Sequence, residues 1–146
     1  MKSIIREMRE CDREAVTEMM RVFYASPALF TNGSEEIFAR DIDACLSCSP
    51  YIEGYIFEGD DGIQGYGMVA KSFSTEFGLP CIWIEDIYIK EKYRGCGIGS
   101  CFIAYIEQKY KGSILRLEVE EENKIATYVY KKAGFDVLPY MEMKKI

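Results

Sequence analysis

Histidine is missing from this chain of 146 residues. No imidazole is therefore available as a general base or a metal ligand, and a catalytic base must be a carboxylate, a tyrosine, a lysine, a cysteine or water. Apolar runs are also short: none approaches the ~20 residues that a membrane-spanning helix needs, and the amino terminus lacks the apolar stretch of a signal peptide. We expect a cytoplasmic protein that does not engage a membrane.

Positive charge is in short supply. The 18 lysines and arginines are outnumbered by 24 aspartates and glutamates, which gives a formal net charge of -6. Nucleic-acid binding depends on neutralising phosphates with basic side chains, so we expect no nucleic-acid partner. A cationic small molecule is a better match to this charge than an anionic one.

Cysteine is present, but not in a pattern that indicates a metal or disulfide framework. The six cysteines should be reduced thiols, because disulfides rarely persist in the cytosol. Cys45 and Cys48 form a C-x-x-C motif at the end of a helical pattern, whereas a redox motif of this type should open a helix. No second pair exists that could complete a zinc site, so we expect no metal.

The length and the 49% hydrophobic content predict a single domain spanning residues 1–146. Hydrophobic periodicity and turn residues predict the order β-α-α-β-β-β-α-β-α-β-β, which indicates an α/β (α+β) fold with a mixed sheet and helices on its faces. The last four elements are expected as a strand over 114–119, a helix over 123–133 and two short strands over 135–138 and 141–146.

A glycine-rich turn between a strand and a helix carries the clearest functional signal. Its sequence is Arg94-Gly95-Cys96-Gly97-Ile98-Gly99, followed by Ser100. Unpaired amides at a helix start attract phosphate, glycines let it approach, and Arg94 adds a permanent charge. A Walker A loop is excluded because no G-x-x-x-x-G-K-[ST] is present. A dinucleotide fingerprint fails where Ser100 replaces its last glycine, although Glu118 lies where a ribose-binding acid would be expected. The alternative interpretation, a turn with only a structural role, is also left open.

Three motifs together resemble the GNAT superfamily of N-acetyltransferases. They are Ile84-Glu85-Asp86-Ile87-Tyr88-Ile89, the turn from Tyr93 to Gly99, and Asn123-x-x-Ala126-x-x-x-Tyr130-x-x-x-Gly134-Phe135. The resemblance implies a mostly antiparallel sheet with about four helices, and acetyl-CoA as acyl donor. The implied donor-binding residues are Ile87, Tyr88, Ile89, Arg94, Gly95, Cys96, Gly97, Ile98, Gly99, Ser100, Asn123, Ala126 and Tyr130.

The resemblance also implies catalytic roles. Tyr130 stands at the position of the family's general acid, and this role is favoured over the competing interpretation of a core tyrosine at helical spacing with Ala126. Glu85 is the first choice as general base, because Ile84-Glu85-Asp86 resembles the Leu-Glu-Asp of spermidine/spermine acetyltransferases. A solvent-facing Glu85 is the competing interpretation, with Glu118, Glu120 or a water chain as base. A covalent role for Cys96 or Cys101 is disfavoured without a histidine to activate the thiol.

The acceptor pocket is expected to involve Tyr24, Glu85 and Asp86, with the loop over 26–32 and the acids Glu35 and Glu36 as further candidates. We expect acetyl transfer from acetyl-CoA to a small primary amine by direct attack in a ternary complex. The alternative is a non-catalytic CoA-binding regulatory module of the same fold. Analogy with the superfamily makes a homodimer possible.

Overall fold

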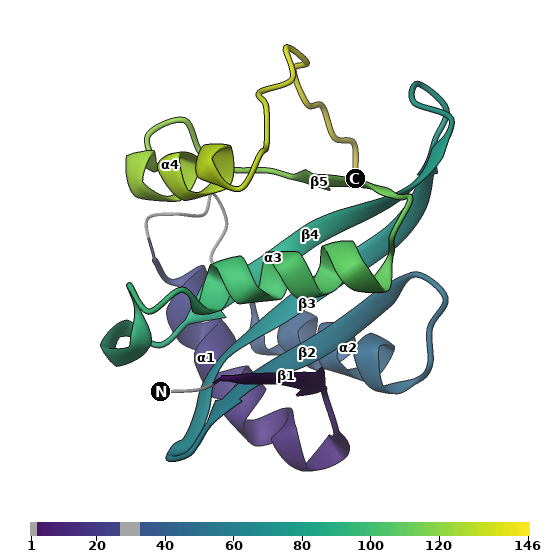
Figure 1. Cartoon of the computed structure of the whole chain (residues 1–146). Coiled ribbons are helices and arrows are strands. Elements are labelled where there is room, and N and C mark those ends of the chain that lie inside the picture. Colours follow the sequence, from purple (N-terminus) through teal and green to yellow (C-terminus); the bar gives the residue numbers. More distant parts are fainter. Residues whose placement is uncertain (1–2, 27–32) are drawn as a thin grey trace.

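The computed structural model describes residues 3–26 and 33–146. Its five-stranded sheet has the order β1-β2-β3-β4-β5, with antiparallel pairing as far as β4 and parallel pairing between β4 and β5 (Figure 1). The strands are β1 (Ile4–Glu7), β2 (Ile52–Gly59), β3 (Gly62–Ser74), β4 (Leu79–Ile89) and β5 (Ile114–Leu117). The helices are α1 (Arg13–Tyr24), α2 (Glu35–Leu46), α3 (Ile98–Lys109) and α4 (Lys124–Lys132), with short 3-10 helices η1 (Glu10–Asp12) and η2 (Glu91–Tyr93).

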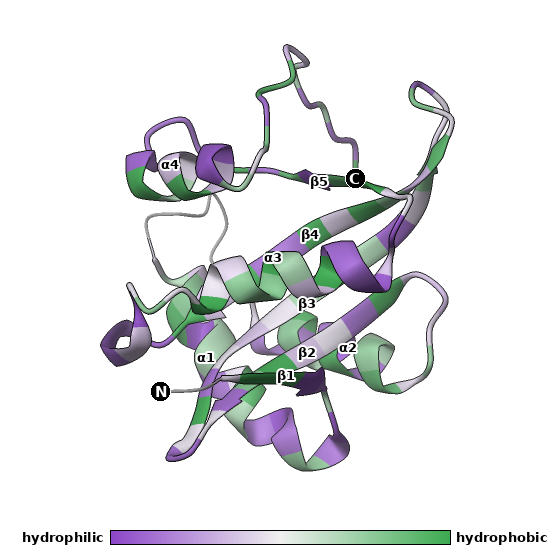
Figure 2. Ribbon diagram, in the orientation of Figure 1, coloured by the Kyte–Doolittle hydropathy of each residue, from purple (hydrophilic) through white to green (hydrophobic). Residues whose placement is uncertain are grey.

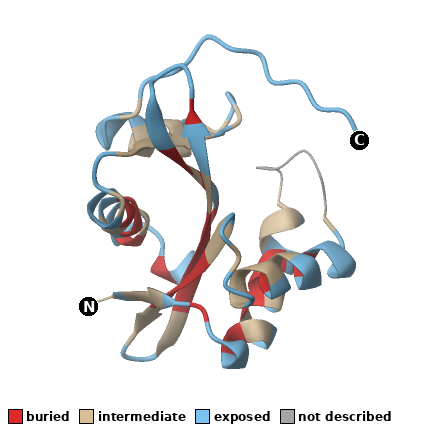
Figure 3. Cartoon of the chain, turned by 90° about the vertical axis from the view of Figure 1, so that its right-hand side faces the viewer, coloured by how far each residue is buried: buried red, intermediate tan, exposed pale blue. Residues whose placement is uncertain are grey.

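Helices cover both faces of the sheet, so the fold has three layers (Figures 1 and 3). One apolar cluster joins α1 and α2 to the sheet through residues such as Met20, Ile42 and Tyr66. A second cluster lies on the opposite face, where Phe102 and Ile106 of α3 pack against β2 and β4. The expected α/β class with a mixed, mostly antiparallel sheet is confirmed. Within the described part of the chain, no helix is both long and apolar enough to cross a bilayer.

The order of elements matches the sequence-based expectation as far as α4, but the last two expected strands differ. The residues after Gly134 form no strand, where strands over 135–138 and 141–146 were expected. Pro139 cannot donate a backbone hydrogen bond to a neighbouring strand. In addition, β5 is only four residues long, so it offers few backbone groups with which a further strand could pair. Figure 2 shows hydrophobic and hydrophilic residues following one another along this extended, exposed segment.

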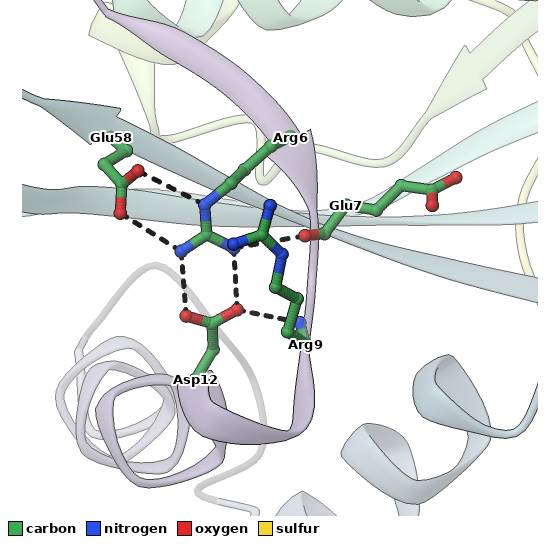
Figure 4. A network of polar contacts seen from close by, with 5 residues as sticks. All are labelled: Arg6, Glu7, Arg9, Asp12 and Glu58. Atoms are coloured by element: carbon green, nitrogen blue, oxygen red, sulfur yellow. Dashed lines mark hydrogen bonds and ion pairs between the residues drawn. The ribbon is translucent and has the colours of Figure 1, made fainter.

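A buried ion network fixes the first strand to the start of α1 (Figure 4). The Arg6 guanidinium donates to both Asp12 carboxylate oxygens, at 2.8 and 2.9 Å, and also to Glu58 of β2. Asp12 occupies the N-cap position of α1, but its side chain does not cap the helix and instead accepts the Arg9 backbone N–H at 2.7 Å. The side chains of Arg6 and Asp12 are only 15% and 4% exposed, so their charges depend on each other for compensation.

Replacing Arg6 by methionine should lower the free energy of unfolding by about 3 kcal/mol, because it leaves the Asp12 carboxylate buried without its partner. Arg13→Met is the matched control: Arg13 pairs with Glu10 and Asp43 at the surface, where solvent screens the charges, so its loss should cost clearly less than the loss of Arg6. Urea unfolding of both variants measures the difference. Equal losses in the two variants would contradict the assignment.

Candidate active site

A pocket opens where β4 and β5 separate. The two strands pair only from Cys81 to Ile84 on β4 and from Ile114 to Leu117 on β5, whereas β4 continues to Ile89. Within the described part of the chain, the outer side of residues 85–89 therefore has no strand beside it. A cavity of about 360 Å³ occupies this position. Its described lining residues are Phe23, Ile84, Glu85, Ile87, Leu117, Glu118, Val119, Glu120, Asn123, Ala126, Tyr130 and Glu142.

A β-bulge at Glu85 gives this part of β4 its geometry. Met68 of β3 pairs with Asp86 and the next residue, Val69, pairs with Ile84, so Glu85 has no partner on β3. An extra residue in one strand reverses the faces of the side chains that follow it. Ile84 accordingly belongs to the cluster under α3, whereas Asp86 turns toward the α1 side of the sheet. Glu85, at the bulge itself, lines the pocket.

Asp86 is a buried carboxylate held by two tyrosines. The hydroxyl of Tyr24 on α1 donates to one carboxylate oxygen at 2.9 Å, and the hydroxyl of Tyr66 on β3 donates to the other at 2.7 Å. Burial raises the pKa of Asp86, and the two hydrogen bonds oppose that rise. Burial and the Asp86 charge raise the pKa of both tyrosines, so they remain protonated donors.

The carboxylates around the pocket share a negative environment. Desolvation raises the pKa of Glu85, and Asp86, Glu142 and Asp41 add like-charge repulsion. A hydrogen bond with Glu142, followed by desolvation, raises the pKa of Glu118 to about 7. Among the described residues that line the pocket there are four glutamates and no lysine or arginine. The arrangement favours a cationic ligand and supplies proton acceptors that titrate closer to neutral pH than ordinary carboxylates.

Tyr130 reaches the same pocket from α4. Its ring packs edge-on against Phe135 with centroids 6.0 Å apart, and desolvation raises the pKa of its hydroxyl. That hydroxyl makes no hydrogen bond to any other residue in the described part of the chain, unlike those of Tyr24 and Tyr66. Asn123 caps the helix that carries Tyr130, since its Oδ1 accepts the Ala126 backbone N–H at 3.2 Å.

The glycine-rich turn forms an open cradle at the start of α3. Gly95 and Gly97 have φ values of +76° and +81°, the left-handed region that favours glycine, and a Cβ added at either would meet nothing within 4 Å. None of the described side chains caps α3, so its first amides remain available to an anion. A Cβ on Gly99 would lie 4.0 Å from Ile87 Cγ2, which places the turn against the free half of β4. The turn and the pocket are therefore neighbours, and the residues present fit a pyrophosphate.

The comparison with known protein families decides between the phosphate-binding alternatives. The model of the acetyltransferase (GNAT) family matches residues 13–135. This chain belongs to the GNAT family. The match includes the glycine-rich turn and all of α4, so the dinucleotide-binding interpretation of Gly95, Gly97 and Gly99 is set aside.

Sequence relatives and solved structures of GNAT type extend this finding. A thialysine N-epsilon-acetyltransferase from Bos taurus is 45% identical over 75 residues, which cover 49% of this chain and 44% of the relative. The same enzyme from Mus musculus is 39% identical over a stretch covering 44% of its length. The match thus spans less than half of these curated relatives.

Two solved structures share the fold at low sequence identity. A possible acetyltransferase from Clostridium difficile 630 aligns with a TM-score of 0.82 and 19% identity, covering 99% of this chain and 97% of the other. An aminoglycoside N-acetyltransferase solved with CoA aligns with a TM-score of 0.80 and 16% identity, covering 99% and 95%. At sequence identities this low, the structural similarity shows that the fold is shared and no more.

The expected GNAT site residues are only partly gathered in the pocket. Glu85, Ile87, Asn123, Ala126 and Tyr130 line it, and Tyr24 and Asp86 form the network behind Glu85. The remaining donor-binding candidates follow along β4 and the turn as far as Ser100.

Two acids suggested for the acceptor pocket have other partners. Glu35 pairs with Arg21 at 2.6 Å and Glu36 with Arg40 at 3.3 Å. Of the acceptor loop over 26–32, residues 27–32 lie outside the described residues. Sequence reasoning missed Phe23 and Glu142, and no motif marks either of them.

The acid-lined pocket predicts an unusual pH dependence of stability. The pKa is raised to about 6 at Asp41, to about 7 at Glu118, and in the same direction at Glu85 and Asp86. A carboxyl whose pKa is higher in the folded chain takes up protons on folding, so lowering the pH stabilises the fold. The free energy of unfolding should therefore rise from pH 8 to pH 5.5, by on the order of 1 kcal/mol after allowing for solvent screening.

Urea unfolding across this range tests the sign. Asp41→Asn should flatten the curve near pH 6, whereas Asp60→Asn, on the exposed turn between β2 and β3, should leave it unchanged. Stability that is constant or falls toward pH 5.5 in the wild type would be inconsistent with the pocket described.

Proposed function

We propose that this chain is an acetyl-CoA-dependent N-acetyltransferase that transfers an acetyl group to a small primary amine by direct attack in a ternary complex. The observation that carries the proposal is the contact between an open phosphate cradle and a pocket lined by Glu85 and Tyr130. The cradle suits the pyrophosphate of the donor, and the pocket suits the proton transfers of the reaction. Sequence relatives named for acetylation of thialysine, and a fold relative named for acetylation of aminoglycosides, support an amine acceptor.

Donor binding would use backbone groups more than side chains. The amides from Gly95 to Ser100 would hold the pyrophosphate at the positive end of the α3 dipole. The outer edge of residues 87–89, beyond the part of β4 that pairs with β5, would pair with the amides of the pantetheine arm. Ala126 would border the arm from α4, and Asn123 would act by fixing the start of that helix. Acetyl-CoA supplies an activated acetyl thioester and a thiolate leaving group.

The acceptor would be a cation held by carboxylates. An alkyl amine with a pKa of about 10.4 is almost entirely protonated near neutral pH. Glu85 lines the pocket and Asp86 adds negative charge behind it, held in place by Tyr24. These groups would attract the ammonium and orient its nitrogen, and the raised pKa of Glu85 makes it a better proton acceptor than an ordinary glutamate.

Two proton transfers would then accompany acetyl transfer. Glu85, directly or through water, would take a proton from the ammonium so that the nitrogen lone pair can form the new N–C bond. Tyr130 would donate its proton as the C–S bond breaks, since it lines the pocket and a phenol hydroxyl can protonate a departing thiolate. Desolvation raises the pKa of Tyr130, which keeps the proton on the hydroxyl until it is needed.

Gly97→Val should abolish most of the affinity for CoA, because the added side chain fills the cradle. Gly78→Val is a matched control: Gly78 has φ +64° and equally open surroundings, but lies at the turn between β3 and β4. Both variants should lose about 1–2 kcal/mol of stability from left-handed backbone strain. Calorimetric titration should show weakened CoA binding only in Gly97→Val; equal affinity in both folded variants would refute the cradle.

Release of free CoA thiol from acetyl-CoA, measured with thialysine, a polyamine and an aminoglycoside, tests the activity. We expect amine-dependent release by the wild type and about 100-fold slower turnover in Tyr130→Phe, with CoA binding and stability retained. Tyr128→Phe serves as the control, because Tyr128 is 66% exposed and lines no described pocket. CoA binding without release for any amine would favour the non-catalytic module instead.

A further inference from the structure

The C-terminal segment, residues 135–146, passes the candidate active site. Figure 3 shows it crossing above the sheet toward the side that carries α1 and α2. One of its residues, Glu142, lines the pocket together with Glu85 and Tyr130. Two lysines follow Glu142 closely, at positions 144 and 145. The segment therefore carries primary amines past a site that suits amine chemistry.

The exposure of neighbouring side chains indicates which lysine faces the pocket. Met141 and Met143 are 83% and 88% exposed, whereas Glu142 between them lines the pocket. Side chains of an extended chain alternate between its two sides, so Lys144 lies on the side of Glu142 and Lys145 on the opposite side. Two residues of extended chain span about 7 Å at most, and the flexible lysine stem adds further reach. The amine of Lys144 is therefore within reach of the pocket.

Lys144 is also free to enter an acidic pocket. Its side chain is exposed and forms no ion pair or hydrogen bond within the described part of the chain. Lys71 and Lys109 differ in this respect, because both pair with Glu53. The four glutamates that line the pocket attract a lysine ammonium as they would the ammonium of a free amine.

Another lysine near the site is less well placed. Lys131 lines a larger cavity of about 680 Å³, bounded by β5, the end of α4 and the C-terminal segment, but it does not line the pocket. It follows Tyr130 on α4, and adjacent side chains on a helix point in different directions. Lys144, on a segment without regular secondary structure, is not fixed in this way.

A tethered amine needs little intrinsic affinity for the pocket. A short flexible link converts binding of the acceptor into an intramolecular step, with effective concentrations on the order of millimolar. Glu142 supplies that link here, because it lies in the pocket wall and only Met143 separates it from Lys144. The lysine is therefore always near the site, whereas a free amine must be captured from solution.

We propose that this chain acetylates its own Lys144, so that the C-terminal segment is an acceptor of the same site. The inference rests on the proposed acetyl transfer. Glu85 takes one proton from the Lys144 ammonium, and the nitrogen lone pair forms the N–C bond as the C–S bond breaks. Tyr130 protonates the leaving thiolate and takes up the second proton of the nitrogen. Acetyl-CoA and the lysine ammonium thus give acetyl-lysine, free CoA thiol and one proton, which passes from Glu85 to water.

Incubation of the wild type with acetyl-CoA that carries a carbon-13-labelled acetyl group, without any amine, tests this by mass spectrometry. Cleavage before Asp136 releases residues 136–146, in which Lys144 and Lys145 are the only lysines. We expect labelling of Lys144 at least about 10-fold faster than of Lys145 or of Lys111, an exposed lysine that lines neither cavity. The rate should not change with protein concentration, because acceptor and site belong to one chain.

Two variants separate catalysed from spontaneous acetylation. Tyr130→Phe should slow labelling of Lys144 about 100-fold and leave the slow labelling of Lys111 unchanged. Lys144→Arg keeps the positive charge but removes the acceptor, so it should still acetylate free thialysine. In a mixture of the two variants, Lys144 of the Tyr130→Phe chain should be labelled no faster than in that variant alone.

Equal labelling of Lys144 and Lys111 would overturn the proposal. So would a preference for Lys145 or Lys131, unchanged labelling in Tyr130→Phe, or transfer to the Tyr130→Phe chain in the mixture. Acetylation of free thialysine without labelling of Lys144 would overturn self-acetylation and leave the proposed function intact. Absence of both reactions would overturn the proposed function, and self-acetylation with it.

Discussion

The bulge at Glu85 is the constraint on which the site depends. On the near side of it, Ile82 and Ile84 point into the core under α3; beyond it, Asp86 and Tyr88 belong to the α1 side. One extra residue thus lets a single strand contribute to both layers and also direct a carboxylate into the gap where β5 ends. Without it, Asp86 would face α3, which offers it neither the Tyr24 nor the Tyr66 hydroxyl.

Placing Asp86 inside the protein has an energetic cost that the surrounding residues reduce only in part. Two phenol hydroxyls donate to it, but no lysine or arginine is among its hydrogen-bond partners in the described part of the chain. The Arg6–Asp12 network offers a contrast, because there a buried carboxylate has a guanidinium and its pKa falls. A buried charge without a cation is what a site for a cationic ligand requires, and it is retained at the expense of stability.

Local chemistry explains which features could be predicted from sequence. The glycine-rich turn is set by neighbouring residues, and the position of Tyr130 follows from its spacing to Gly134. The bulge was missed although the sequence carries a trace of it: the isoleucines change phase from positions 82 and 84 to positions 87 and 89, across the adjacent polar residues Glu85 and Asp86. Glu142 was missed for a different reason: its approach to Glu118 depends on the path of the C-terminal segment, where the expected strands do not form.

The acidic lining sets two requirements against each other. A negative pocket concentrates ammonium ions, but it also stabilises them in the protonated form, which cannot attack a thioester. Two other effects provide a way out of this conflict: desolvation raises the pKa of Glu85, and the hydrogen bond with Glu142 raises that of Glu118, so the proton affinities of acid and amine come closer. Proton transfer from ammonium to carboxylate then removes one positive and one negative charge from the pocket. Repulsion among the remaining carboxylates would fall as the proton arrives, so a cluster suited to binding a cation is also suited to deprotonating it.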